Sequence, residues 1–272
     1  MSPGHISGAG QIRVYVGKCF RLFSTERQWK NFISTAIIMG IISLVTSEDM
    51  FRSYSPTKNG AFAIVCACVW IGLFNSIQSI CRERSIIKRE YRTGLCISSY
   101  ILAHVVYELV LCAVESLIVT VVVCLKNLNH LPDSGLILPM ALDLYITLFL
   151  VVFSADMIAI LVSSIVHSEN TAMTVMPFVL IVQLVMSGAV FPLEGMTEGI
   201  SWFTLSRWGL NAICAIANTN AGVEAEYTAI GATGADPEAL TLLSAWLLLL
   251  AFSAAYVALS ILFLRRVDRD KR

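Results

Sequence analysis

The stretch "LCISSYILAHVVYELVLCAVESLIVTVVVCL", residues 95–125, decides the fold. Its only Asp, Glu, Lys or Arg residues are Glu108 and Glu115, and it is longer than the roughly 18 apolar residues that a membrane-spanning helix needs. The whole chain shares this character, with 57% hydrophobic residues, 14% charged residues and a mean hydropathy of +0.74. This composition excludes an ordinary soluble domain and gives no sign of nucleic-acid binding. We therefore expect an all-α, polytopic membrane protein.

Apolar runs near the length of a bilayer crossing predict six transmembrane helices. The expected spans are residues 29–47, 60–80, 97–125, 136–165, 171–191 and 239–264.

The Lys and Arg residues predict how these spans are oriented. Of the 19, five lie up to the start of the first span, five between the second and third spans and five after the last, which leaves four on the opposite side. The positive-inside rule then puts both termini in the cytoplasm of a multi-pass cell-membrane protein. Residues 29–264 form the transmembrane domain in this prediction, and residues 265–272 form a basic cytoplasmic tail.

Residues 1–28 are expected to contain a cytoplasmic amphipathic helix. The apolar side chains of Ile12, Val16, Cys19, Phe20 and Phe23 share one helical face, from which the cations are absent. This pattern favours a helix that lies at the membrane surface and leads into the first span. A helix that packs on soluble protein is the alternative.

The predicted extracellular segment, residues 192–238, begins with apolar and aromatic residues. A plain loop is one interpretation, and short helices that re-enter the outer leaflet are the other. Trp202, Phe203 and Trp208 suit an interfacial depth, so we favour a re-entrant segment before the last helix.

Ionisable residues inside the predicted spans are costly and need compensation. His104, Glu108 and Glu115 share one face of the third span, where they form either a buried polar seam between helices or a path for protons or substrate. Asp143 and Asp156 point to opposite sides of the fourth span, and we expect both to form hydrogen bonds between helices.

No catalytic motif, metal-binding spacing or phosphate-binding loop is found in the sequence. We therefore expect a chain that is not an enzyme and binds no cofactor or metal of its own. If the protein uses ATP, another chain binds it.

A charged block, "RERSIIKREYRTG" at residues 82–94, separates the second and third spans on the predicted cytoplasmic side. Basic residues next to a membrane bind anionic lipid headgroups, which is one role for this block. A helix that docks on a partner protein is the other, and the pattern alone favours neither.

The details of this block resemble the first cytoplasmic loop of G-subfamily ABC exporters, also called type V exporters. The resemblance rests on Glu83 and Arg84, then Arg89 and Glu90 after four residues, followed by Gly94 and the sequence "SSYILA". It implies that residues 81–94 form the coupling segment that contacts the ATPase, with those four charged residues at the contact.

Two other regions carry the same resemblance. The N-terminal amphipathic helix is similar to the family's connecting helix, and "SWFTLSRWGLNA" is similar to the re-entrant element before the sixth span, with Arg207 and Trp208 at matching positions. The proline that usually precedes this arginine is replaced by Ser206, and the external cysteines of many animal members are missing.

The resemblance further implies a central cavity between two protomers, lined by the second and fifth spans. The matching positions are Cys68, Ile71, Asn75, Ile181 and Leu184, with Ala189 and Val190 at an outer constriction. These residues are mostly apolar, so we expect lipophilic or amphipathic cargo. The implied partners are an ABC ATPase subunit that holds ATP and Mg, a second permease chain, identical or related, and membrane lipids.

Two other functions stay open. The chain can be a stand-alone membrane sensor or immunity protein whose charged block binds headgroups. It can also be a proton-coupled carrier that uses His104, Glu108 and Glu115.

Overall fold

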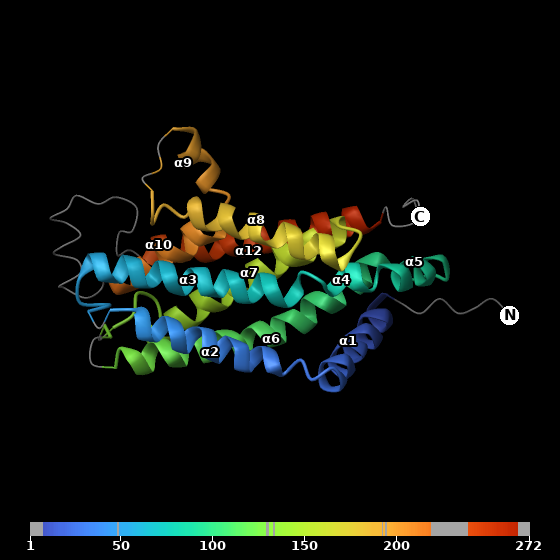
Figure 1. Ribbon diagram of the computed structural model, residues 1–272, viewed down its shortest axis with the longest axis horizontal. Helices are drawn as coiled ribbons and strands as arrows, with labels where there is room; N and C mark the ends of the chain where they lie inside the picture. The colour runs from blue at the N-terminus through green and yellow to red at the C-terminus, as the bar shows by residue number, and fades with distance from the viewer. Residues whose placement is uncertain are drawn as a thin grey trace.

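The computed structural model describes residues 8–47, 49–128, 131–132, 134–191, 193, 195–218 and 239–265. Over these residues the secondary structure is helical, without a strand, as predicted (Figure 1). Residues 1–7, residues 219–238 of the predicted extracellular segment and nearly all of the predicted tail lie outside the described residues.

Eleven described helices follow one another along the chain. They are α1 (Gly8–Thr25), α2 (Lys30–Val45), α3 (Tyr54–Ser76), α4 (Ser79–Arg82), α5 (Arg84–Arg92), α6 (Ile97–Lys126), α7 (Met140–Ile165), α8 (Glu169–Val185), α9 (Met196–Ser201), α10 (Leu205–Ala217) and α12 (Ala239–Leu264).

Within the described part of the chain, four helical segments are long and apolar enough to cross a membrane. They are α3 together with α4, then α6, α7 and α12. The pair formed by α1 and α2 is bent by 69° and adds a fifth span if it is counted as one. Helix α8 is apolar but has only 17 residues, about 26 Å at the rise of an α-helix. The described residues therefore contain four or five candidate spans, and the predicted number of six is not confirmed.

Helix α7 is the centre of the bundle and packs against α3, α6, α10 and α12. Two glycines allow the close approach of its neighbours. A Cβ atom on Gly72 of α3 would lie 2.6 Å from the carbonyl oxygen of Val152, and one on Gly209 of α10 would lie 2.7 Å from Val151 Cγ2. The backbones of α3 and α10 can reach α7 only because these positions lack side chains.

One end of the bundle carries α1, α5 and the end of α12, at the right of Figure 1. Arg265, directly after α12, donates a hydrogen bond of 3.3 Å to Ser98 Oγ in the first turn of α6. Gln11 of α1 accepts one of 2.9 Å from the backbone N–H of Cys96. The N-terminal helix, the charged block and the end of the last helix thus share one end, as the charge distribution predicts, and we call it the coupling end.

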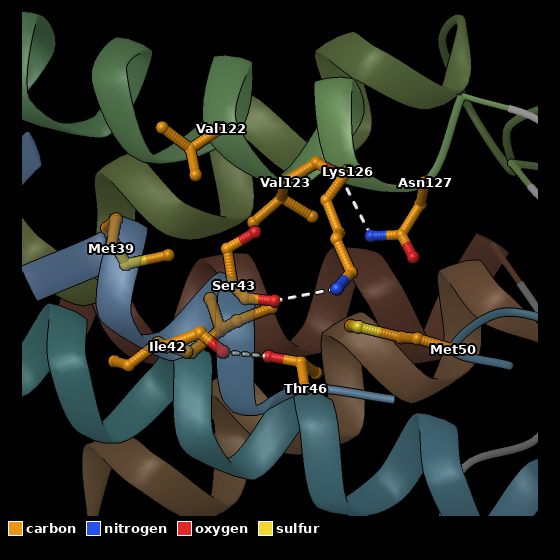
Figure 2. Close-up of a pocket in the computed structure, with 10 residues that line it drawn as sticks. Met39, Ile42, Ser43, Thr46, Met50, Val122, Val123, Lys126 and Asn127 are labelled. Atoms are coloured by element: carbon orange, nitrogen blue, oxygen red, sulfur yellow. Dashed lines mark hydrogen bonds between the residues drawn. The ribbon is translucent and has the colours of Figure 1, made fainter. Parts of the chain in front are cut away.

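At the opposite end, α6 is joined to α2 (Figure 2). Lys126 Nζ donates a hydrogen bond of 2.8 Å to the carbonyl oxygen of Ser43, above a cavity of about 10 Å³. Met39 and Met50 contribute to its wall and are almost fully buried. The ammonium group therefore binds the last turn of α2, where free carbonyl groups attract a cation.

The prediction for Asp143 is wrong. Its carboxylate accepts hydrogen bonds of 2.8, 3.1 and 3.1 Å from the backbone N–H groups of Leu136, Ile137 and Leu138. It therefore holds the loop before α7 instead of joining two helices. The sequence pattern misses this because a buried carboxylate in a first helical turn can also bind the backbone that precedes it.

Candidate functional site

The charged block folds as a corner between α4 and α5, and Glu83 lies at the turn. One of its carboxylate oxygens accepts hydrogen bonds from Lys18 Nζ of α1 at 2.8 Å and from the Tyr100 hydroxyl of α6 at 2.9 Å. Tyr100 is 1% exposed. Glu83 therefore joins three helices inside the protein, and its side chain is mostly covered.

Arg84 and Glu90 are also bound within the chain. Arg84 Nη1 donates hydrogen bonds of 2.9 and 3.0 Å to the carbonyl oxygens of Ser164 and Val166, at the end of α7. Glu90 accepts a hydrogen bond of 2.7 Å from the Tyr15 hydroxyl of α1. Burial raises the pKa of Tyr15 above its ordinary value, and this hydrogen bond raises it further.

Two further contacts hold the ends of the corner against α1 and the turn that follows it. Arg82 makes two hydrogen bonds of 3.1 and 3.0 Å to the carboxylate of Glu26. Gln11 Nε2 donates a hydrogen bond of 3.3 Å to the carbonyl oxygen of Gly94. Gly94 has φ of +107°, a backbone conformation that favours glycine, and it turns the chain from α5 into α6.

The outer face of α5 is open, whereas its inner face is packed. Ile87 is fully buried, while Ile86, Arg89, Tyr91 and Arg92 are exposed. Of the four predicted contact residues, Arg89 alone is exposed, and the other three fasten the corner to α1, α6 and α7.

A groove of about 520 Å³ lies beside the corner, between α4, the start of α5 and the connection from α7 to α8. Its walls include Arg84, His167 and Glu169. The surface at the coupling end is therefore hollowed and carries charges of both signs, which suits a polar and register-specific protein contact.

The polar seam predicted on α6 is present and extends into two other helices. His104, Glu108 and Glu115 are 7%, 3% and 1% exposed. Asn75 of α3 donates a hydrogen bond of 2.6 Å to Glu115. This hydrogen bond offsets part of the free-energy cost of burying polar groups between helices.

Asp156 of α7 joins the same region, as predicted for an interhelical hydrogen-bonding group. It accepts hydrogen bonds from Ser76 Oγ of α3 at 2.8 Å and from Cys112 Sγ of α6. The Cys112 thiol therefore serves as a hydrogen-bond donor between α6 and α7. Within the described residues, no group of three or more His, Cys, Asp or Glu side chains is arranged to hold a metal ion.

The predicted cavity residues range from buried to exposed in the isolated protomer. Cys68 and Ile71 are buried in the helix packing, 0% and 3% exposed, whereas Ile181 is 54% exposed. Asn75 and Leu184 are half-buried.

Helices α3 and α8 also carry large exposed side chains that the sequence reasoning missed. Trp70 and Phe74 of α3 are 44% and 52% exposed, and Phe178 of α8 is 66% exposed, on two helices that contact each other. Trp70 and Phe74 are four residues apart, and this i, i+4 aromatic pair on an apolar helix is the signal that could have found them.

The predicted re-entrant element is built by α9 and α10. Helix α10 is buried among α3, α7 and α12, and Gln183 of α8 accepts a hydrogen bond of 2.8 Å from the backbone N–H of Leu205 at its start. Ser206, in the place of the usual proline, donates its hydroxyl hydrogen to the Gln183 carbonyl oxygen. The Gln183 side chain is 6% exposed, and its hydrogen bonds hold the start of α10.

Arg207 and Trp208 hold α9 against α10. The Arg207 guanidinium lies 5.3 Å from the centre of the Trp202 ring and binds the Ser201 hydroxyl. Trp208 Nε1 donates a hydrogen bond of 2.9 Å to the carbonyl oxygen of Trp202. At the turn that leads toward α9, Ala189 is half-buried and Val190 is 56% exposed.

These features define a helical membrane domain with a fastened, charged corner at one end and a short buried helix near the other. The chain belongs to the family described as ABC-2 type transporter, whose model matches residues 11–217. The ABC transporter ATP-binding/permease protein Rv1747 of Mycobacterium tuberculosis (strain ATCC 25618 / H37Rv) is 26% identical over 224 residues, 78% of this chain and 26% of the relative. The chain thus spans about a quarter of the length of this curated relative.

The family match confirms the expected class at the level of the ABC-2 transporters. The protein is a multi-pass membrane protein and an ABC transporter permease, a transport domain and not a catalytic one. Permeases of this family work with an ATP-binding subunit.

Proposed function

We propose that this chain is the permease subunit of an ATP-driven exporter that moves a lipophilic or amphipathic substrate out across the cell membrane. ATP and Mg are bound and used by a separate ATPase chain at the coupling end. The observation that carries the proposal is the corner of α4 and α5, which is fastened to three other helices while Arg89 stays exposed. The mycobacterial relative is named an ATP-binding/permease protein, which supports the association of the permease with an ATPase.

The geometry suggests how force would be transmitted. An ATPase that moves against the exposed face of α5 pushes a rigid corner, because Glu83, Arg84 and Glu90 tie it to α1, α6 and α7. Packed helices respond to such a push as rigid bodies that have discrete arrangements. The displacement would then open the transport path on one side and close it on the other.

The substrate path is proposed between two permease chains, at the open face of α3 and α8. Ile181, Trp70 and Phe178 give this face an apolar and aromatic surface. Such a surface favours lipophilic or amphipathic cargo, and the outer constriction at Ala189 and Val190 would close the path toward the outside.

The substitution Arg89→Glu tests the proposal. It reverses an exposed charge on α5, so the ATPase should no longer copurify with the permease, while thermal unfolding of the permease itself stays unchanged. Arg52→Glu is the matched control, because Arg52 is an exposed arginine before α3, far from the charged corner, and its guanidinium lies 3.8 Å from the Asp49 carboxylate in an exposed ion pair. This control should retain the ATPase.

Two results would contradict the proposal. If native protein brings down no ATPase but binds anionic vesicles through Arg89, the chain is a stand-alone membrane protein. If transport follows a pH gradient in vesicles that contain no ATP, the buried carboxylates of α6 act as a proton path instead.

A further inference from the structure

A second and larger cavity, of about 580 Å³, lies at the coupling end between α1, the end of α3, α4 and α6. It shares Phe74 with the exposed side of α3 that is proposed above as part of the substrate path, but no residue of α8 lines it. Leu22, Phe74 and Leu111 line it with apolar surface, and His104 and Glu108 line it with buried polar groups. Its size falls within the range of small-molecule binding sites, about 300 to 1,000 Å³.

The charged groups at the rim of this cavity already have partners. Lys18 lies 2.8 Å from Glu83, and Arg82 lies 3.0 Å from Glu26. The four charged groups of the rim therefore form two ion pairs. Among the described residues of the rim, each cation is balanced by an anion.

The buried wall has more hydrogen-bond acceptors than donors. His104 Nδ1 has no hydrogen-bond partner among the described residues, although the side chain is only 7% exposed. Glu108 is 3% exposed on the same helix face, and both residues line the cavity. Nδ1 of a neutral imidazole that carries its hydrogen on Nε2 is an acceptor, and a carboxylate only accepts.

A second carboxyl group lies behind this wall. Asn75 lines the cavity and donates to Oε1 of Glu115, while Glu115 Oε2 has no partner within the described part of the chain. Buried acceptors without donors are costly, so a ligand that supplies N–H groups and positive charge would relieve this wall.

We propose that this cavity binds the ammonium group of an amphipathic amine. The N–H groups donate to the Glu108 carboxylate, while the hydrocarbon tail lies against Leu22, Phe74 and Leu111. Charge-assisted hydrogen bonds of this kind are the strong ones, and the Tyr107 ring in the same wall adds a surface that attracts cations. The further proposal that the bound amine is cargo rests on the permease function proposed above.

Binding of simple probes to the permease with its ATPase, in phosphatidylcholine nanodiscs, tests this inference. Isothermal titration should give about tenfold tighter binding for dodecylamine than for dodecanol, and the weakest binding for dodecyl sulfate. Glu108→Gln keeps the size of the side chain but removes its charge, so it should abolish the preference for the amine. Glu198→Gln, a carboxyl on exposed α9, is the control and should leave the preference unchanged.

If the native protein binds dodecylamine and dodecanol with equal affinity, the inference is overturned. This outcome does not depend on the folding of a variant. An unchanged preference in folded Glu108→Gln would overturn it as well. Measurement of ATPase activity in the same samples separates the two proposals. Amine binding without any effect on ATPase activity would contradict the cargo role, and coupled ATPase activity without amine selectivity would contradict this site alone.

Discussion

At the scale of single residues, the charged corner separates into side chains that hold the protein together and side chains that face outward. Glu83 is the clearest case of the first kind, since it accepts hydrogen bonds from both Lys18 and Tyr100. A carboxylate in this position stiffens the corner because it connects α1 and α6 through one group. Its contribution to coupling is therefore expected to be indirect, through the rigidity of the corner.

A double-mutant cycle on Glu83 and Tyr100 measures this connection. Glu83→Gln and Tyr100→Phe should each lower the free energy of unfolding, and the pair should be non-additive by about 1 kcal/mol because both remove the same hydrogen bond. Chemical unfolding in detergent provides the measurement. Strict additivity would show that the hydrogen bond contributes nothing to stability.

Cys96 gives a second prediction at this scale. It is the exposed residue among the eight cysteines, and the backbone N–H of Ser99 in the first turn of α6 lowers its pKa. A lower pKa means more thiolate at a given pH, so alkylation by a water-soluble iodoacetamide should be faster than for an unperturbed cysteine, and its pH midpoint should be lower. Cys96→Ser should abolish the rapid phase, and a midpoint at the ordinary thiol value would contradict the prediction.

At the scale of the elements, the bundle depends on how closely α3 approaches α7. Gly72 lies where the two helices touch, whereas Gly17 of α1 has no atom within 4 Å of an added Cβ. The same substitution should therefore have opposite effects at the two positions.

Gly72→Ala should destabilise the protein by about 1 to 2 kcal/mol, because the added methyl group meets the Val152 carbonyl and overpacking exceeds the gain in helix propensity. Gly17→Ala should be neutral or stabilising by up to about 1 kcal/mol. Thermal unfolding followed by tryptophan fluorescence checks both. A stable Gly72→Ala protein would mean that α3 and α7 can separate without cost.

At the scale of the whole molecule, α3 and α8 present an open apolar face that the protomer does not cover. A second permease chain is the occupant proposed for this face. Helix α12 is also exposed, with Leu247 at 62%, so exposure alone does not distinguish a protein contact from a lipid contact.

Cysteine cross-linking distinguishes the two faces. In a Cys96→Ser background, Ile181→Cys should form disulfide-linked dimers in membranes, because the two copies of α8 would meet across the pair. Leu247→Cys on α12 should remain monomeric under the same oxidation. Equal cross-linking at both positions would show random collisions, and efficient cross-linking only at Leu247 would place the interface on α12.

The sequence by itself determined the class of protein and much of its layout. The long apolar runs predicted an all-helical membrane bundle, and the family resemblance carried by Glu83, Arg84, Arg89 and Glu90 predicted a permease of an ABC transporter, a class that the ABC-2 family match confirms. These features are readable because hydropathy and motif spacing are local properties of the chain. The number of spans did not follow from hydropathy in the same way, because α8 has only 17 residues and α2 begins after a sharp bend.

Only the tertiary structure decided which face each of these residues presents. It turned Glu83, Arg84 and Glu90 inward, buried Cys68 and Ile71, and assigned Asp143 to a loop and Gln183 to the start of α10. The physical reason is that a polar group takes the partner that packing brings within hydrogen-bond distance. On a helix that is apolar on every side, periodicity does not tell which side will meet another helix.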